Sequence, residues 1–127
     1  MTFFAVLANG ETFATIVWQA AKMMRSHSYF VYVLASKSYG TLYVGITNNL
    51  VRRMMEHRNG TVEGFTKKYG VRRLVWYEFH ENVHEAIAME KRLKRWRRDW
   101  KISLIERNNP HWIDLFPALA RLEGAPV

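Results

Sequence analysis

Apolar runs in the middle of the chain predict three β-strands. Residues 29–36 (YFVYVLAS) and 41–47 (TLYVGIT) are rich in aromatic and β-branched side chains and contain no proline, which is typical of strands. The segment between them, 37–40, is polar and ends in glycine, so we expect a hairpin. A third run of the same character, RRLVWYEF, covers residues 72–79.

Helical spacing and an asparagine cap predict a helix after the hairpin. Either Asn48 or Asn49 can cap a helix at residues 50–58, and the dipeptide Asn59-Gly60 is a typical stop signal. The polar residues 61–70 that follow are expected to form a loop.

Three more helices are expected after the third strand. Asn82 is a cap for the first of them, and Asn109-Pro110 is typical of the start of the last, which Pro117 should end or kink. Their expected ranges are 83–97, 100–106 and 111–116. The order β-β-α-β-α-α, which leaves out the short last helix, predicts an α+β fold, a small three-stranded antiparallel or mixed sheet flanked by helices.

The elements predict one domain with a segment on each side. Residues 28–117 hold every strand and helix named above, and a chain of 127 residues suffices for one modest core. Residues 1–27 differ in composition. They are either an accessory extension or the product of an upstream start codon, with the natural start at Met23 or Met24. Residues 118–127 are expected to be a C-terminal tail.

Charge makes nucleic acid the first expected partner. The chain has 19 Lys+Arg against 11 Asp+Glu, a net charge of +8 and a pI near 10, and small basic domains usually bind polyanions. The absence of cysteine excludes disulfides and thiolate chemistry and fits the cytoplasm, where we expect the protein. The chain has no apolar run long enough to cross a bilayer, so we expect no membrane partner.

One carboxylate interrupts an apolar helical row. Steps of three and four along the helix at 83–97 give a row that is apolar except at Glu90. The row is Val83, Ala86, Ile87, Glu90 and Leu93. A carboxylate against a sheet is costly unless it is paired, so Glu90 either pairs with a nearby lysine or arginine or binds a metal.

The helix at 50–58 carries a second polar pair. Arg53 and His57 are four residues apart and therefore lie on one face of that helix. Their ordinary interpretation is an arginine lying beside the core and a surface histidine with its hydrogen bonds satisfied.

The hairpin supplies two phenols. If Ala35 pairs with Leu42, Tyr32 lies opposite Gly45 and diagonal to Tyr43. Both tyrosines then share one face of the sheet, with a gap over the glycine. Tyrosines in strands are more often packing residues than catalytic ones.

Taken in order, these residues resemble the GIY-YIG nuclease superfamily, and within it the small stand-alone bacterial members. The resemblance runs from Tyr29 to about Leu115, and each motif alone is weak while the ordered series is specific. The first motif departs from the family because its glycine is replaced. The matching segments are Phe30-Val31-Tyr32, Tyr43-Val44-Gly45, Leu50-x-x-Arg53-x-x-x-His57, Phe65-Thr66-x-Lys68-Tyr69, Glu90 and Asn109-Pro110-x-Trp112.

The resemblance implies a single-metal endonuclease that hydrolyses phosphodiester bonds of DNA. It implies that Glu90 binds Mg²⁺ or Mn²⁺, that Arg53 contacts the scissile phosphate, and that Tyr32 activates or orients the attacking water. Tyr43 and His57 would assist. The asparagine that often accompanies the glutamate would be Asn109, with Asn108 as the alternative.

The identity of the general base stays open at this stage. A tyrosine with a pKa of ~10 is a poor base at neutral pH, but Arg53, a metal and a lysine would lower that pKa. The candidate lysines are Lys37, Lys67 and Lys68. Alternatively, His57 is the base and the phenols orient the water. Gly45 is expected to let the phosphate backbone approach the strand.

Cations around the proposed site are expected to bind nucleic acid. They are Arg52, Arg58, Lys67, Lys68, Arg72 and Arg73. The run KRLKRWRRDWK at 91–101 interleaves cations with Trp96 and Trp100; we expect its arginines to bind the backbone and its tryptophans to pack on the sheet.

The substrate class and the assembly are less defined. The expected substrate is DNA, in branched or single-stranded form, with repair, recombination and defence all compatible. A symmetric dimer is one way to cut both strands. The alternatives are a non-catalytic nucleic-acid-binding module on the same scaffold and a subunit that positions a partner nuclease.

Overall fold

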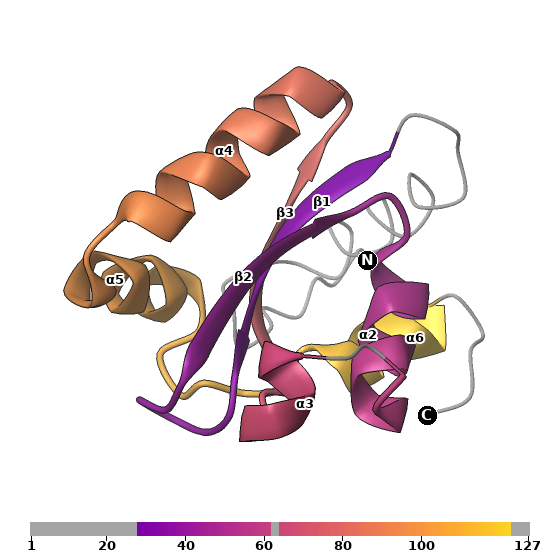
Figure 1. Cartoon of the computed structure of the whole chain (residues 1–127), viewed down its shortest axis with the longest axis vertical. Helices are drawn as coiled ribbons and strands as arrows, with labels where there is room; N and C mark the ends of the chain where they lie inside the picture. The colour runs from indigo at the N-terminus through magenta and orange to yellow at the C-terminus, as the bar shows by residue number, and fades with distance from the viewer. Residues whose placement is uncertain (1–27, 62–63, 123–127) are drawn as a thin grey trace, which may run out of the picture.

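The computed structural model describes residues 28–61 and 64–122. The proposed extension at 1–27 and the end of the chain at 123–127 lie outside the described residues. Along the chain, Figure 1 shows the following elements: β1 (Tyr29–Ala35), β2 (Leu42–Thr47), α2 (Leu50–Asn59), α3 (Phe65–Tyr69), β3 (Arg73–His80), α4 (Val83–Arg95), α5 (Arg98–Asn108) and α6 (Phe116–Leu122). In this part of the chain, no helix has the length and apolar character that a membrane span requires.

The three strands form one antiparallel sheet with the order β2-β1-β3. The predicted register is confirmed, since Ala35 pairs with Leu42 and Tyr32 lies opposite Gly45. The expected α+β fold, a small sheet flanked by helices, is therefore present, and the sheet is wholly antiparallel.

Helices cover both faces of the sheet, which explains why the central strand is so apolar. Residues 30–35 of β1 are all buried, and they alternate between two cores. Phe30, Tyr32 and Leu34 pack with α2 and α6. Their neighbours Val31 and Val33 pack with α4 and α5 on the other face, so the two helical layers lie on opposite sides of the sheet (Figure 1).

The asparagine caps occur as predicted. The Asn49 side chain accepts a hydrogen bond from the N–H of Arg52, and α2 ends at Gly60, which has a φ of 71°. The Asn82 side chain likewise accepts bonds from the first turn of α4. The start of α2, which carries Arg53 and His57, is thus fixed immediately after the hairpin.

The expected loop at 61–70 is wrong, because residues 65–69 form α3. This helix lies between Gly64 and Gly70, both with positive φ. Five residues are too few to show a helical period, so the pattern alone could not reveal α3. Its one buried residue is Thr66.

The expected helix at 111–116 is also wrong. The Asn109 side chain does not cap a helix there; its Nδ2 donates to the backbone oxygens of Val75 and Ile113, and its Oδ1 accepts from the N–H of Ile113. The last helix, α6, begins at Phe116, where the Asp114 side chain accepts the N–H of Phe116.

Pro117 neither ends nor kinks a helix. It lies in the first turn of α6, where a missing N–H costs little. Leu119 and Ala120 are buried in the core that contains Tyr32. The folded domain therefore extends past residue 117 through α6, and residues 118–122 are not a free tail.

Candidate active site

A hydrogen-bonded chain links β1, α2 and α3. The Oη atom of Tyr32 lies 3.2 Å from Nε2 of His57, and Nδ1 of His57 lies 3.0 Å from Oγ1 of Thr66. All three residues are buried. A surface histidine was the ordinary interpretation of His57, but the imidazole is enclosed and both of its nitrogens have partners.

Gly45 makes room for the Tyr32 ring. A Cβ atom at position 45 would lie 2.4 Å from the Tyr32 hydroxyl oxygen and equally close to the carbon that bears it. The gap expected over the glycine is thus filled by the phenol across the strand pair. We expected Gly45 to let the phosphate backbone approach the strand. In the structure, the close approach of the Tyr32 ring is what requires a glycine at this position.

Aromatic rings extend this cluster to the surface. The Tyr43 ring lies 6.3 Å from the Tyr32 ring and 5.8 Å from the His57 ring. It stacks at 6.3 Å on Phe65, which is exposed on α3, as is Tyr69 beside it. Solvent therefore reaches the cluster from the α3 side.

The pKa of Tyr32 is raised well above its ordinary value, mainly because the phenol is buried and secondarily because Tyr43 is near. Arg53 acts in the opposite direction, and Glu90 adds to the rise. Arg53 lowers this pKa as expected, but burial outweighs the arginine, so the net shift is upward. Tyr32 is therefore a neutral hydrogen-bond donor at pH 7.

The pKa of His57 is lowered from 6.5, first by burial and then by the Arg53 charge, with Glu56 opposing. The imidazole is therefore neutral at pH 7 and has one donor and one acceptor nitrogen. We assign the tautomer in which the Tyr32 hydroxyl donates to Nε2 and Nδ1–H points to Thr66, because a phenol is a stronger donor than an alcohol. His57 is poised to take a proton at Nε2.

Arg53 has an unused donor beside this chain. Its Nε is buried and has no hydrogen-bond partner in the described part of the chain. The nearest carboxylate, Glu56, lies 3.7 Å from that nitrogen, too far for a hydrogen bond. A buried guanidinium N–H without a partner is costly, and an anionic ligand would satisfy it.

Glu90 fits both interpretations of its place in the apolar row. Its side chain is only 16% exposed, and its Oε2 lies 3.5 Å from Nζ of Lys94, one turn further along α4. Although α4 packs on the sheet face opposite Tyr32, the Glu90 charge still acts on the Tyr32 phenol. The charges of Glu90 and Arg53 thus shift the pKa of the Tyr32 phenol in opposite directions, Glu90 raising it and Arg53 lowering it.

The donor set is compatible with one kind of metal. Within residues 28–61 and 64–122, no group of three or more His, Cys, Asp or Glu side chains could enclose an ion. A single carboxylate suits Mg²⁺, which keeps several water ligands and is often bound by one or two carboxylates together with substrate phosphate.

Other predicted site residues have structural partners. Both amide N–H groups of Asn109 bond to backbone oxygens, so its donors serve the loop after α5. Arg58 forms an ion pair with Asp114 and lies 4.4 Å above the Phe116 ring. Arg73 donates to the backbone oxygen of Trp112.

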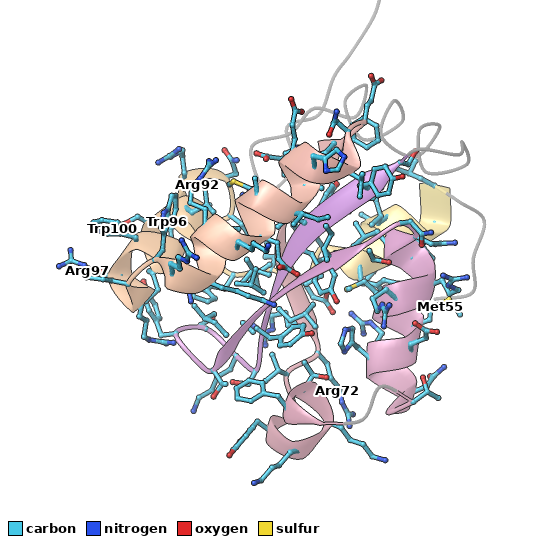
Figure 2. All side chains as sticks on the ribbon, turned by 45° about the horizontal axis from the view of Figure 1, so that its top comes forward. Met55, Arg72, Arg92, Trp96, Arg97 and Trp100 are labelled. Atoms are coloured by element: carbon cyan, nitrogen blue, oxygen red, sulfur yellow. The ribbon has the colours of Figure 1, made fainter. Side chains whose placement is uncertain are left out.

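The remaining predicted nucleic-acid contacts are on the surface. These exposed residues are Arg52, Lys67, Lys68 and Arg72. Lys67 and Lys68 belong to α3, next to the aromatic cluster, and Figure 2 shows Arg72 on the same side of the molecule.

Sequence reasoning missed the role of Thr66. The residue was part of a motif, but its segment was expected to be a loop and the threonine carried no assignment. Only the three-dimensional contact with His57 reveals it, because the two residues are nine positions apart on different helices.

Comparison with known proteins gives the same family as the sequence motifs. The sequence model of the GIY-YIG catalytic domain matches residues 28–103. The chain is 41% identical over 76 residues to a UPF0213 protein of Clostridium perfringens, covering 60% of this chain and 81% of that protein.

Two further similarities lie in the same range. A UPF0213 protein of Bacillus pumilus is 35% identical over 83 residues, 65% of this chain and 84% of the relative. The NMR structure of a UPF0213 protein from Bacillus halodurans has a TM-score of 0.43 and 28% identity, with coverage of 65% of this chain and 86% of that one. The family model matches residues 28–103, more than half of this chain, and the chain therefore belongs to the GIY-YIG catalytic domain family.

Proposed function

We propose that the protein is a divalent-metal-dependent endonuclease that hydrolyses phosphodiester bonds of DNA. The observation that carries the proposal is the buried hydrogen bond between Tyr32 and His57, beside Arg53, whose Nε has no hydrogen-bond partner among the described residues. Tyr32 is hydrogen-bonded to a neutral His57, and the charges of Arg53 and Glu90 both act on it. A base, a phosphate clamp and a metal-binding carboxylate are what such a reaction requires.

Arg53 serves as the phosphate clamp. Its planar guanidinium can grip two phosphoryl oxygens and stays charged at any working pH. Substrate phosphate would supply the acceptor that the buried Nε lacks. Binding energy is therefore gained at the group that also stabilises the transition state.

Glu90 would hold Mg²⁺ or Mn²⁺, with water and phosphate completing the coordination. When bound, such an ion supplies Lewis-acid stabilisation of phosphoryl charge and of the leaving 3′-oxygen. Lys94, which pairs with Glu90 from an exposed position, would give up this ion pair if Glu90 held a metal and could then contact phosphate.

Tyr32 and His57 act as a proton relay. The water transfers a proton to Oη of Tyr32 as the phenol proton passes to Nε2 of His57. The oxygen of the resulting hydroxide forms a bond to phosphorus, and the bond to the leaving 3′-oxygen breaks; that oxygen takes a proton from solvent. This mechanism makes His57 the base and requires no phenolate in the resting protein.

A binding module without catalysis is the second candidate, and the ion pair of Glu90 with Lys94 favours it. An incubation series separates the two functions. Purified protein is mixed with branched, single-stranded or duplex DNA in Mg²⁺, Mn²⁺ or EDTA. If the protein is a nuclease, it should cleave DNA only when metal is present. If it binds DNA but does not cleave it with either metal, it is a binding module.

A further inference from the structure

A cationic corner lies where α4 meets α5. Between residues 91 and 101 the cations far outnumber the one carboxylate, Asp99. The cations are Lys91, Arg92, Lys94, Arg95, Arg97, Arg98 and Lys101. Figure 2 shows the labelled Arg92, Arg97, Trp96 and Trp100 grouped at this corner, away from Arg72. The charge here is thus separate from that around α3.

Trp100 is on the solvent side of α5, contrary to the expected packing on the sheet. Its residue surface is 50% exposed, whereas Ile105 of the same helix is fully buried. Five residues at 100° each put the two side chains about 140° apart around the helix. Because the core face of α5 is turned away, half of the Trp100 surface stays open to solvent.

Two neighbouring side chains contact the Trp100 ring and fix its orientation. Trp96, partly buried against the core, meets the Trp100 ring edge-on at 6.0 Å and 87°. The Arg97 guanidinium lies 4.9 Å from the centroid of the Trp100 ring. Arg97 also pairs with Asp99 at 3.3 Å, a largely exposed contact that a phosphate can replace at little cost.

The corner is anchored to the sheet. Nη2 of Arg98 donates to the backbone oxygens of Tyr39 and Gly40 in the β1–β2 turn, at 2.6 and 2.7 Å. The pKa of Lys101 is lowered by partial burial and by the Arg98 charge, as expected where cations crowd together. The start of α5 is therefore held in place with an excess of positive charge.

We propose that this corner binds an unpaired strand of the nucleic-acid substrate, with one base stacked on Trp100 and its phosphates on Arg97 and neighbouring cations. An indole that stacks on bases beside arginines is how proteins bind single strands. A duplex offers no such base face, because each interior base is covered by its neighbours in the stack. The proposal rests on the nucleic-acid substrate proposed above.

Continuity with the candidate active site favours the same substrate. Lys94 belongs to the cationic corner and also contacts Glu90 at 3.5 Å. From Glu90 to the end of α4 at Arg95 is five residues, about 7.5 Å along the helix. A strand leaving the scissile phosphate past Glu90 would meet this charge within a few nucleotides.

A membrane surface is the less suitable occupant. An interfacial helix needs a free apolar face, but the apolar side chains of α5 are packed against the sheet core. What remains exposed is one indole among charges.

Equilibrium binding in EDTA tests the proposal without cleavage. The probes are a fluorescein-labelled oligothymidylate and a blunt DNA hairpin of equal strand length. The proteins are wild type, Trp100→Ala, Trp100→Phe and the charge control Arg107→Gln, which changes an exposed arginine near the other end of α5. Thermal melts establish that each variant is folded.

The expected result is a loss specific to the single strand. Trp100→Ala should weaken oligothymidylate binding about tenfold, and Trp100→Phe should restore most of it because a ring remains. Arg107→Gln should lose far less, and hairpin affinity should change by less than about twofold in both Trp100 variants. Oligothymidylate binding should also quench indole fluorescence in wild type more than in Trp100→Ala.

Three results would overturn it. They are unchanged single-strand affinity in Trp100→Ala, an equal loss for oligothymidylate and hairpin, or a Trp100-dependent preference for anionic phospholipid vesicles over both. The outcome is independent of nuclease activity: the corner can fail in a protein that cleaves DNA, and it can bind in one that does not.

Discussion

At the scale of single residues, the chain from Tyr32 through His57 to Thr66 determines which atom can take a proton. Thr66 is a positioning residue, since it acts on His57 and has no assigned contact with substrate. Replacing Thr66 with valine keeps the shape and removes the acceptor of Nδ1–H. We expect cleavage to slow about tenfold or more, because general base catalysis depends on the correct tautomer.

The matched control for that substitution is Thr66→Ser, which keeps a hydroxyl. Single-turnover rates should recover in the serine variant if the hydroxyl orients His57. Equal rates in Thr66→Val and wild type would contradict the positioning role. Rates that fall equally in the valine and serine variants would indicate packing instead.

Titration of His57 provides a second test at this scale. Burial and the Arg53 charge lower its pKa from 6.5, so the group stays neutral as pH falls through 6.5 and protonates only below that. As pH falls, His57 is protonated in the unfolded chain near 6.5 but in the folded protein only at a lower pH. Between these two pKa values the unfolded state binds more protons, so the free energy of unfolding should decrease as pH falls. Arg53→Gln removes one cause and should raise the pKa.

The measurement is an NMR titration of the imidazole resonances, assigned with His57→Gln. A His57 pKa below 6.5 in wild type and a higher one in Arg53→Gln are expected. A wild-type value at or above 6.5 would remove the neutral base from the mechanism.

At the scale of secondary structure elements, Gly45 links the strand register to the relay. A Cβ atom there would overlap the Tyr32 phenol at 2.4 Å. Gly45→Ala should therefore displace that ring and cost about 1–3 kcal/mol of unfolding free energy, as overpacking does. Urea denaturation measures the loss, and cleavage should fall with it because the Tyr32–His57 bond is broken. A variant with wild-type stability and activity would refute this close approach.

Asp114 joins three elements, and its loss should destabilise the fold. Its Oδ1 accepts N–H groups from Leu74 in β3 and Phe116 in α6, and its Oδ2 pairs with Arg58 of α2. Asp114→Ala should cost about 2 kcal/mol or more, because it removes a helix cap and leaves backbone donors unpaired. Asp114→Asn keeps an acceptor and should lose less; equal losses in urea denaturation would contradict the capping account.

The sequence predicted elements where local pattern and tertiary contacts agree. The register of Ala35 with Leu42, an assumption for the hairpin that alternation alone does not fix, is the observed one, and Asn49 and Asn82 cap as expected. The errors occurred where a distant partner decides. Asn109 bonds across to β3 rather than capping a helix, and α3 is too short to have a period.

The candidate site divides in the same way. Motif order alone predicts Tyr32, Arg53, His57 and Glu90 as candidate site residues. The pKa of Tyr32 and the role of Thr66 could not be named, since burial and a contact between two helices are properties of the folded chain.

At the scale of the whole molecule, positive charge lies on two sides of the candidate site. One group is exposed on and near α3, and the other forms the corner of α4 and α5. Binding of DNA should therefore weaken steeply with salt, as counterions compete for several contacts. This arrangement suits a substrate that passes the site and continues to the corner.

The central claim is that Glu90 and Arg53 act on one reaction centre, and a double-mutant cycle tests it most directly. Single-turnover cleavage in Mg²⁺ is measured for wild type, Glu90→Ala, Arg53→Ala and the double variant. Groups that work as a unit are strongly non-additive. We predict that each single variant is slowed at least about a hundredfold and that the double variant is hardly slower than the worse single one. Wild-type cleavage in Glu90→Ala, or losses that simply multiply, would contradict the account.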